Sequence, residues 1–190
     1  MPAMPGLPDA EPPLTEVMQR ALTVLWALGP EVVLDLGCGP GRETLALTAL
    51  PGVRVVAIDT DGEALAAAPA HANVLYVRAD ATRLPLASSA AQAAYSFGLL
   101  QALGGTSDAP TRHLTQELQR VLDPSGVVVM GTLADFRRIE RPDRSLTGAE
   151  VSKALRGRFV LQELIGLMDL EHDGQRCRYW YIAATPIAAG

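Results

Sequence analysis

The residues with the most chemical content lie between an apolar run and a helical pattern early in the chain. The run at 32–36 contains an acid, and a loop with three glycines at alternate positions follows it in the string D-L-G-C-G-P-G. Glycine allows backbone dihedral angles that are closed to other residues, and it lets a ligand approach the main chain closely. A strand, a glycine loop and a helix N-terminus in this order are typical of a nucleotide-binding turn.

The spacing of the glycines bears on the kind of nucleotide. Dinucleotide-binding turns usually carry G-x-G-x-x-G, with the pyrophosphate at the helix N-terminus. This chain has G-x-G-x-G, and Asp35 stands two residues before the first glycine. Because like charges repel strongly in a partly buried site, Asp35 disfavours a pyrophosphate and favours a ligand that carries an ammonium group.

Two more acids follow later apolar runs. The run V-R-V-V-A-I leads to Asp59, about 20 residues after Gly37, and V-L-Y-V-R-A leads to Asp80. A carboxylate after the second strand of a nucleoside-binding α/β fold accepts hydrogen bonds from ribose hydroxyls. Structural alternatives stay open, since Thr60 and Glu63 form a T-x-x-E capping box and Asp80 can cap the turn after its strand. Three acids in register with the glycine loop favour a ligand site.

Two motifs carry a family resemblance. D-L-G-C-G-P-G closely resembles the first motif of the class I methyltransferases that use S-adenosylmethionine (SAM), and D-A-T-R-L-P resembles that family's D-A-x-x-L-P segment. The resemblance implies SAM as the cofactor, with the Asp80 carboxylate at the adenine amino group and the Ala81 N–H at a ring nitrogen. It also implies that the backbone at Ser96 and Phe97 helps to hold the methionine end. The predicted cofactor-binding residues are Asp35, Gly37, Cys38, Gly39, Gly41, Asp59, Thr60, Asp80, Ala81 and Ser96.

The acceptor of the methyl group is expected at the switch point of strand order, beyond the ends of the first and fourth strands. Phe97 and Gln101 are predicted to face it, with a core aromatic and an ordinary helix position as their alternatives. No catalytic residue is assigned. The leaving group in methyl transfer from a sulfonium is a neutral thioether, which needs no general acid, and placement of the nucleophile supplies much of the acceleration. The three histidines are expected in a loop, on a helix surface and beside the late hairpin, at His71, His113 and His172.

Three positions depart from the family pattern. Gln92 stands where the family usually has Asp, Gln101 lies where related small-molecule enzymes often have histidine, and Ser125 replaces a glycine. The change at Gln92 is expected to weaken a structural contact, and the one at Gln101 removes an obvious general base.

Strand-like and helix-like segments alternate along the chain, which indicates parallel strands joined by crossover helices. Strands are expected at 32–36, 53–58, 74–79, 93–97, 127–132, 159–170 and 177–185, and helices at 15–28, 43–50, 61–68, 109–122 and from 147. The dipeptide Asp173-Gly174 between the last two apolar runs predicts a hairpin. The predicted fold is α/β and doubly wound, with helices on both faces of a mostly parallel seven-stranded sheet and a C-terminal antiparallel hairpin. By the resemblance, its strand order is 3-2-1-4-5-7-6.

Length and composition limit the alternatives. The chain has 190 residues, 48% hydrophobic and 19% charged, which fits one globular domain. Residues 1–13 contain five prolines and are expected to be a disordered arm, with 14–190 as a single SAM-binding domain. No apolar run is long enough for a membrane helix, no secretory signal is evident, and two distant cysteines suggest neither a disulfide framework nor a metal site. We therefore expect a cytoplasmic protein.

These observations predict a SAM-dependent methyltransferase that acts on a small molecule by in-line displacement. The net charge of −5 disfavours a nucleic-acid partner. Two alternatives remain: a SAM-binding protein without turnover, as a sensor or partner subunit, and an NAD-linked oxidoreductase.

Overall fold

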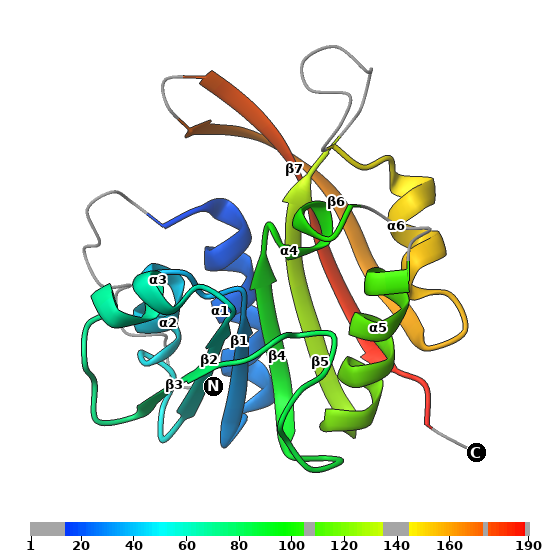
Figure 1. Ribbon diagram of the computed structural model, residues 1–190. Helices are drawn as coiled ribbons and strands as arrows, with labels where there is room; N and C mark the ends of the chain where they lie inside the picture. Colours follow the sequence, from blue (N-terminus) through cyan, green and yellow to red (C-terminus); the bar gives the residue numbers. More distant parts are fainter. Residues whose placement is uncertain (1–13, 105–108, 135–144, 173–174, 189–190) are drawn as a thin grey trace.

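The computed structural model describes residues 14–104, 109–134, 145–172 and 175–188, and its strands form one sheet (Figure 1). The strands are β1 (Val32–Leu36), β2 (Arg54–Asp59), β3 (Val74–Arg78), β4 (Ala91–Phe97), β5 (Leu122–Leu133), β6 (Phe159–His172) and β7 (Gln175–Pro186). The helices are α1 (Glu16–Leu28), α2 (Arg42–Leu47), α3 (Gly62–Ala67), α4 (Leu99–Ala102), α5 (Ala109–Val121) and α6 (Gly148–Leu155). The strand order β3-β2-β1-β4-β5-β7-β6 confirms the predicted topology.

The sheet is parallel except at one side. The strands β3, β2, β1, β4 and β5 run parallel to one another, whereas β7 pairs antiparallel with both β5 and β6. The carboxyl ends of β1 to β4 therefore meet at one edge. The residues of the predicted hairpin turn, 173–174, lie outside the described residues.

Both faces of the sheet are buried along the central strands β1, β4 and β5, which explains why these strands appear as continuous apolar runs. Side chains alternate along a strand, so Val33 lies on the face covered by α1 and α2, and Leu34 lies on the face covered by α5 and α6. In Figure 1 the helices α5 and α6 stand in front of the sheet. The N-terminal end of α1 is capped by the Thr15 side chain, and Gly29, in the left-handed conformation, ends the helix as the sequence predicts.

Three local features differ from the sequence-based expectation. The helix α2 ends at Leu47 instead of residue 50, β5 begins at Leu122 instead of 127, and the short helix α4 was not predicted. The crossover from β3 to β4, residues 79–90, contains no helix. It is held by α5 instead: the Leu84 N–H donates to Glu117, and Arg120 donates to the Leu84 and Leu86 carbonyls.

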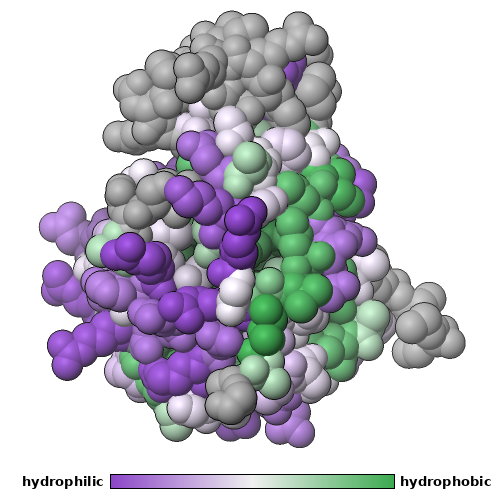
Figure 2. Space-filling view, turned by 90° about the vertical axis from the view of Figure 1, so that its right-hand side faces the viewer, coloured by the Kyte–Doolittle hydropathy of each residue, from purple (hydrophilic) through white to green (hydrophobic). Residues whose placement is uncertain are grey.

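The side of the molecule that carries β6 and α6 is divided between polar and apolar surface. Figure 2 shows hydrophobic residues gathered in a band beside a hydrophilic region. Val160 and Ile187 are among the exposed large hydrophobic residues. None of the helices within the described ranges has the length and apolar character needed to cross a membrane.

Candidate functional site

The glycine loop connects β1 to α2 at the carboxyl edge of the sheet. Gly37, Gly39 and Gly41 all have positive φ angles, of 74°, 52° and 86°, which L side chains rarely adopt. The N–H groups of Gly37 and Cys38 donate to the Ile58 carbonyl at 2.8 and 3.2 Å, so the loop is tied to β2. A Cβ at Gly39 would meet nothing within 4 Å, and the space above the middle of the loop is therefore open.

Asp59, the last residue of β2, lies directly beside this loop. One carboxylate oxygen accepts the Gly39 N–H at 2.8 Å, and the other accepts the Asp61 N–H at 2.9 Å. The side chain is half-buried. The structure thus brings Asp59 and the glycine loop together, as the sequence predicts, and leaves further lone pairs on both carboxylate oxygens for a ligand.

Asp35 lies beneath the loop. Its side chain is buried, with 1% exposure, and its Oδ2 accepts the Thr44 hydroxyl of α2 at 2.6 Å. Burial raises the pKa of Asp35 to about 7; the Thr44 hydrogen bond opposes this rise, and the neighbouring Glu43 and Asp59 add to it. Where the sequence suggested a partly buried acid facing the ligand, the structure has a fully buried carboxyl that links β1 to α2.

Asp80 follows β3 and is exposed. Its Oδ1 accepts both the Thr82 N–H, at 2.8 Å, and the Thr82 hydroxyl, at 2.7 Å. These hydrogen bonds lower the pKa of Asp80. The carboxylate caps the turn after its strand, which was its structural alternative, and the adjacent Ala81 is buried.

The capping box at Thr60 and Glu63, which was the structural alternative for this segment, is not what the structure has. The N-cap of α3 is Asp61, whose carboxylate accepts the N–H groups of Glu63 and Ala64. Asp59 is therefore not part of such a capping box, and its carboxylate accepts hydrogen bonds from Gly39 of the glycine loop and from Asp61.

Comparison with known proteins places this geometry in a family. A family model described as a methyltransferase domain matches residues 33–126, which contain the glycine loop and the strand ends at Asp59 and Asp80. The chain belongs to the class I methyltransferase family. No curated protein sequence matches this chain significantly.

Solved structures share the fold of this chain at low sequence identity. A SAM-dependent methyltransferase from Methanosarcina mazei has a TM-score of 0.76 and 16% identity, over 93% of this chain and 99% of that chain. The 1,6-didemethyltoxoflavin-N1-methyltransferase of Burkholderia thailandensis has a TM-score of 0.70 and 21% identity, over 91% and 79% of the two chains. A [4+2]-cyclase has a TM-score of 0.69 and 17% identity, over 88% and 82%. These likenesses establish the fold alone.

The glycine-loop edge of the sheet fits SAM, the cofactor that the family implies. Gly39 opens onto empty space, so a ligand can lie against its backbone. At Gly41 a Cβ would come within 2.6 Å of the Tyr76 hydroxyl oxygen, so the loop leaves no room for a larger residue there. The half-buried Asp59 carboxylate beside Gly39 disfavours a phosphate there and suits a nucleoside whose tail is cationic.

The two predicted acceptor residues take part in packing at the ends of β4 and β5. The Phe97 ring lies 5.0 Å from the Tyr179 ring, centroid to centroid, and also occupies the space beside Gly131. The side-chain oxygen Oε1 of Gln101 accepts the Thr132 hydroxyl at 3.0 Å and also the Leu133 N–H. Both contacts support the structural alternatives, since they join the end of β4 and α4 to β5 and β7.

The neighbouring predicted positions behave in different ways. Ser96 is buried at the end of β4, and Gln92 accepts the Val32 N–H at 2.9 Å, so the contact expected to weaken there is present. His71 and His113 are exposed, in a loop and on α5. The side chains of His172 and Cys177 lie outside those that the structure describes. Burial, assisted by Asp35 and Asp59, raises the pKa of the Cys38 thiol to about 12, so the thiol stays neutral.

Sequence reasoning missed two residues of the site, Thr44 and Tyr76. Thr44 follows the last glycine by three positions, and its contact with Asp35 required only that α2 begin at once. Tyr76 lies on β3 and reaches the loop across β2. Alternation along β3 identifies the face on which Tyr76 lies, but no sequence pattern indicates how far its ring extends.

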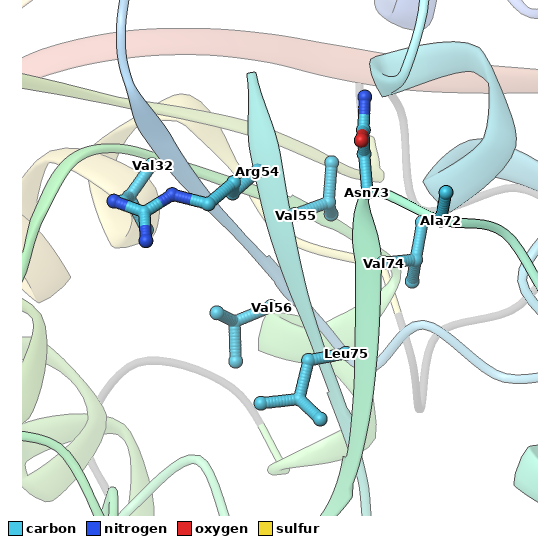
Figure 3. Close-up of a pocket in the computed structure, with 8 residues that line it drawn as sticks. All are labelled: Val32, Arg54, Val55, Val56, Ala72, Asn73, Val74 and Leu75. Atoms are coloured by element: carbon cyan, nitrogen blue, oxygen red, sulfur yellow. The ribbon is translucent and has the colours of Figure 1, made fainter. Parts of the chain in front are cut away.

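A separate hollow lies at the opposite ends of the same strands (Figure 3). Its volume is about 230 Å³, and it is lined by Val32, Arg54, Val55, Val56, Ala72, Asn73, Val74 and Leu75. These residues belong to the amino ends of the strands, where the crossover without a helix leaves Leu75 61% exposed. The hollow is therefore not part of the glycine-loop site.

Proposed function

We propose that this protein is a methyltransferase that binds SAM at the glycine-loop edge and transfers its methyl group to a small molecule. The observation that carries the proposal is the 2.8 Å hydrogen bond from the Gly39 N–H to Asp59, beside a loop that opens onto empty space. It joins the two parts of a nucleoside site, a backbone cradle and a carboxylate for the ribose. The acidic net charge of −5 supports a small acceptor over a nucleic acid.

In this proposal, different residues of the chain bind the amino-acid end, the ribose and the adenine of the cofactor. The N–H groups of Gly37, Cys38 and Gly39 already donate to Ile58 and Asp59, so the loop offers its carbonyl oxygens to the ammonium group of the cofactor. Asp59 accepts hydrogen bonds from the ribose hydroxyls. Asp80 and the Ala81 N–H meet the adenine, with Thr60 beside them. Ser96, buried at the end of β4, supports the methionine end. Asp35 acts from beneath, through Thr44 and the start of α2.

Catalysis in this proposal depends on position. Bound SAM supplies an electrophilic methyl group on a sulfonium, which leaves as a neutral thioether. The protein therefore needs to hold the acceptor in line with that methyl group, and a base is useful only for a hydroxyl or protonated amine. Gln101 Oε1 accepts hydrogen bonds from Thr132 and Leu133 of β5, so in this proposal Gln101 helps to hold the ends of β4 and β5 in place and does not act as a base.

A binding measurement tests the proposal. Isothermal titration with S-adenosylhomocysteine should show one site per chain, and NAD should not compete. At a ligand concentration 100 times the dissociation constant, the free energy of unfolding should rise by about 2.7 kcal/mol. Isotope-labelled SAM with a panel of small molecules, read by mass spectrometry, then identifies the acceptor. Absence of binding would overturn the proposal, and tight NAD binding would favour the oxidoreductase alternative.

A second candidate function is SAM binding without methyl transfer. It is favoured by the use of Phe97 and Gln101 in packing, and by a [4+2]-cyclase that shares the fold. Labelled product with any acceptor in the panel would remove it.

A further inference from the structure

A row of residues crosses the first three strands beneath the glycine loop. Strand register places Asp35 beside Ala57, and Ala57 beside Tyr76. All three side chains point to the face that α2 covers, because directly paired residues share a face of the sheet. Ala57 is small and fully buried. The Tyr76 ring can therefore extend over it toward the loop.

The ring ends against the last glycine of the motif. A Cβ at Gly41 would lie 2.6 Å from the Tyr76 hydroxyl oxygen and 3.3 Å from the ring carbons Cε1 and Cζ. Real Cβ atoms essentially never approach another atom as closely as 2.6 Å. The tip of Tyr76 thus occupies space that any side chain at position 41 would need.

The main chain of Gly41 is hydrogen-bonded both to the glycine loop and to α2. Its N–H donates to the Cys38 carbonyl at 3.0 Å, and its own carbonyl accepts the Leu45 N–H at 3.1 Å. Its φ angle of 86° is in the left-handed region. Any displacement of Gly41 would move both the turn at Cys38 and the first turn of α2.

The hydroxyl of Tyr76 has no evident structural purpose of its own. Among the described side chains, only the hydroxyls of Tyr76 and Tyr95 are buried polar atoms without a hydrogen-bond partner. Burial, together with Cys38 and Asp35, raises the pKa of the Tyr76 phenol, so it stays neutral. Phenylalanine would fill the ring's space without burying an unpartnered oxygen. What phenylalanine lacks is the atom nearest to Gly41.

We propose that Tyr76 is a positioning residue for the cofactor, acting through Gly41: the tip of its phenol sets the position of the third glycine and thereby the main-chain groups of the loop. The inference rests on the proposed function, since it concerns the affinity of the same site.

A double-mutant cycle on Gly41 and Tyr76 tests the inference, with the dissociation constant of S-adenosylhomocysteine as the readout. Gly41→Ala should weaken binding at least about thirtyfold, because the new Cβ meets the Tyr76 hydroxyl at a left-handed position. Tyr76→Phe alone should weaken binding about threefold to fivefold, because the atom that sets the position of Gly41 is lost. The pair Gly41→Ala/Tyr76→Phe should recover at least about fivefold of the loss, a coupling within the range that residues in contact show.

Two matched cycles separate this contact from general effects. Gly39 also has a positive φ angle, but a Cβ at this position would meet nothing within 4 Å. Any affinity that Gly39→Ala loses should therefore not be recovered by adding Tyr76→Phe. Tyr95 is the other buried phenol without a partner, and it flanks Asp35 on β4, so Tyr95→Phe should not rescue Gly41→Ala. Equal coupling in either control would overturn the inference.

The outcomes distinguish this inference from the proposed function. If the wild-type protein binds S-adenosylhomocysteine but Gly41→Ala and Tyr76→Phe are additive, only the inference fails. If the wild type does not bind, the proposed function fails and the inference with it. Should Gly41→Ala fail to fold, refolding by added Tyr76→Phe would support the contact. If neither folds, Tyr76→Leu decides: a loss of about tenfold in affinity supports the inference, and unchanged affinity overturns it.

Discussion

The strands β1, β2 and β3 end in two very different ways. At their carboxyl ends the glycine loop is tied by main-chain hydrogen bonds to β2, and Asp59 and Asp35 each have polar partners. At their amino ends an apolar hollow of about 230 Å³ is lined by residues such as Val56 and Leu75, with no acid among them. The hollow is thus not the end that carries the nucleoside chemistry, which depends on preorganised polar groups.

The largest effect is expected from the buried carboxyl at the glycine-loop end. Burial raises the pKa of Asp35 to about 7 from 3.8. Between these values the unfolded chain has released a proton that the folded protein keeps, so wild-type stability falls as the pH rises. Asp35→Asn removes this dependence and retains an acceptor for Thr44. Its stability relative to wild type should therefore grow by roughly 4 kcal/mol in total between pH 4 and pH 7, and then level off.

Denaturant unfolding at a series of pH values measures this difference. Asp80→Asn serves as the control, because the Thr82 hydrogen bonds lower the pKa of Asp80, so its titration lies below this window. A difference between Asp35→Asn and wild type that stays constant from pH 4 to pH 7 would contradict a buried Asp35 that keeps its proton.

The next largest effect is expected from filling the open space above the loop. Gly39→Leu should weaken S-adenosylhomocysteine binding at least about a hundredfold, or ~2.7 kcal/mol, because its side chain occupies the ligand's place. Gly52 is the matched control: it precedes β2 near the hollow end, has a φ angle of 66°, and also faces open space. Gly52→Leu should lower the free energy of unfolding about as much as Gly39→Leu does, and it should leave the S-adenosylhomocysteine affinity unchanged. Equal affinities of the two variants in isothermal titration would break the distinction between the two ends.

A smaller loss is expected at Asp59. Asp59→Ala removes the acceptor of the Gly39 N–H and the predicted partner of the ribose, and should weaken binding by about twentyfold, or ~1.8 kcal/mol. Asp61, two residues later, caps α3. Asp61→Ala should lower the free energy of unfolding by about 1 kcal/mol without changing affinity. Titration and thermal unfolding of both variants check the pair, and an affinity loss shared by both would assign the effect to α3 instead.

The smallest effect is expected at the hollow. Leu75 is 61% exposed, so Leu75→Ser should change the free energy of unfolding by less than about 0.5 kcal/mol and leave S-adenosylhomocysteine affinity unchanged. A clear loss of affinity in this variant would show that the two ends of the strands are coupled.

Much of the fold could be predicted because its signals are local. Alternating apolar runs located all seven strands, and the family resemblance of the loop supplied their order. The helix α1 ends at Gly29 and α6 begins after the capping box at Thr147, at the bounds that the sequence predicted for these two helices. The ends of α2 and β5 and the short helix α4 were missed, since tertiary packing decides such boundaries and short elements carry little periodicity.

The sequence by itself determined which residues stand at the strand ends, because the positions of glycines and acids along a strand-loop-helix unit follow from backbone geometry. Only the tertiary structure decided what those side chains contact. Strand register set Tyr76 behind Gly41, the packing of α2 buried Asp35 against Thr44, and the approach of α4 to β5 gave Gln101 its partners. These contacts join residues far apart in the chain or on different elements, and no spacing within one segment encodes them.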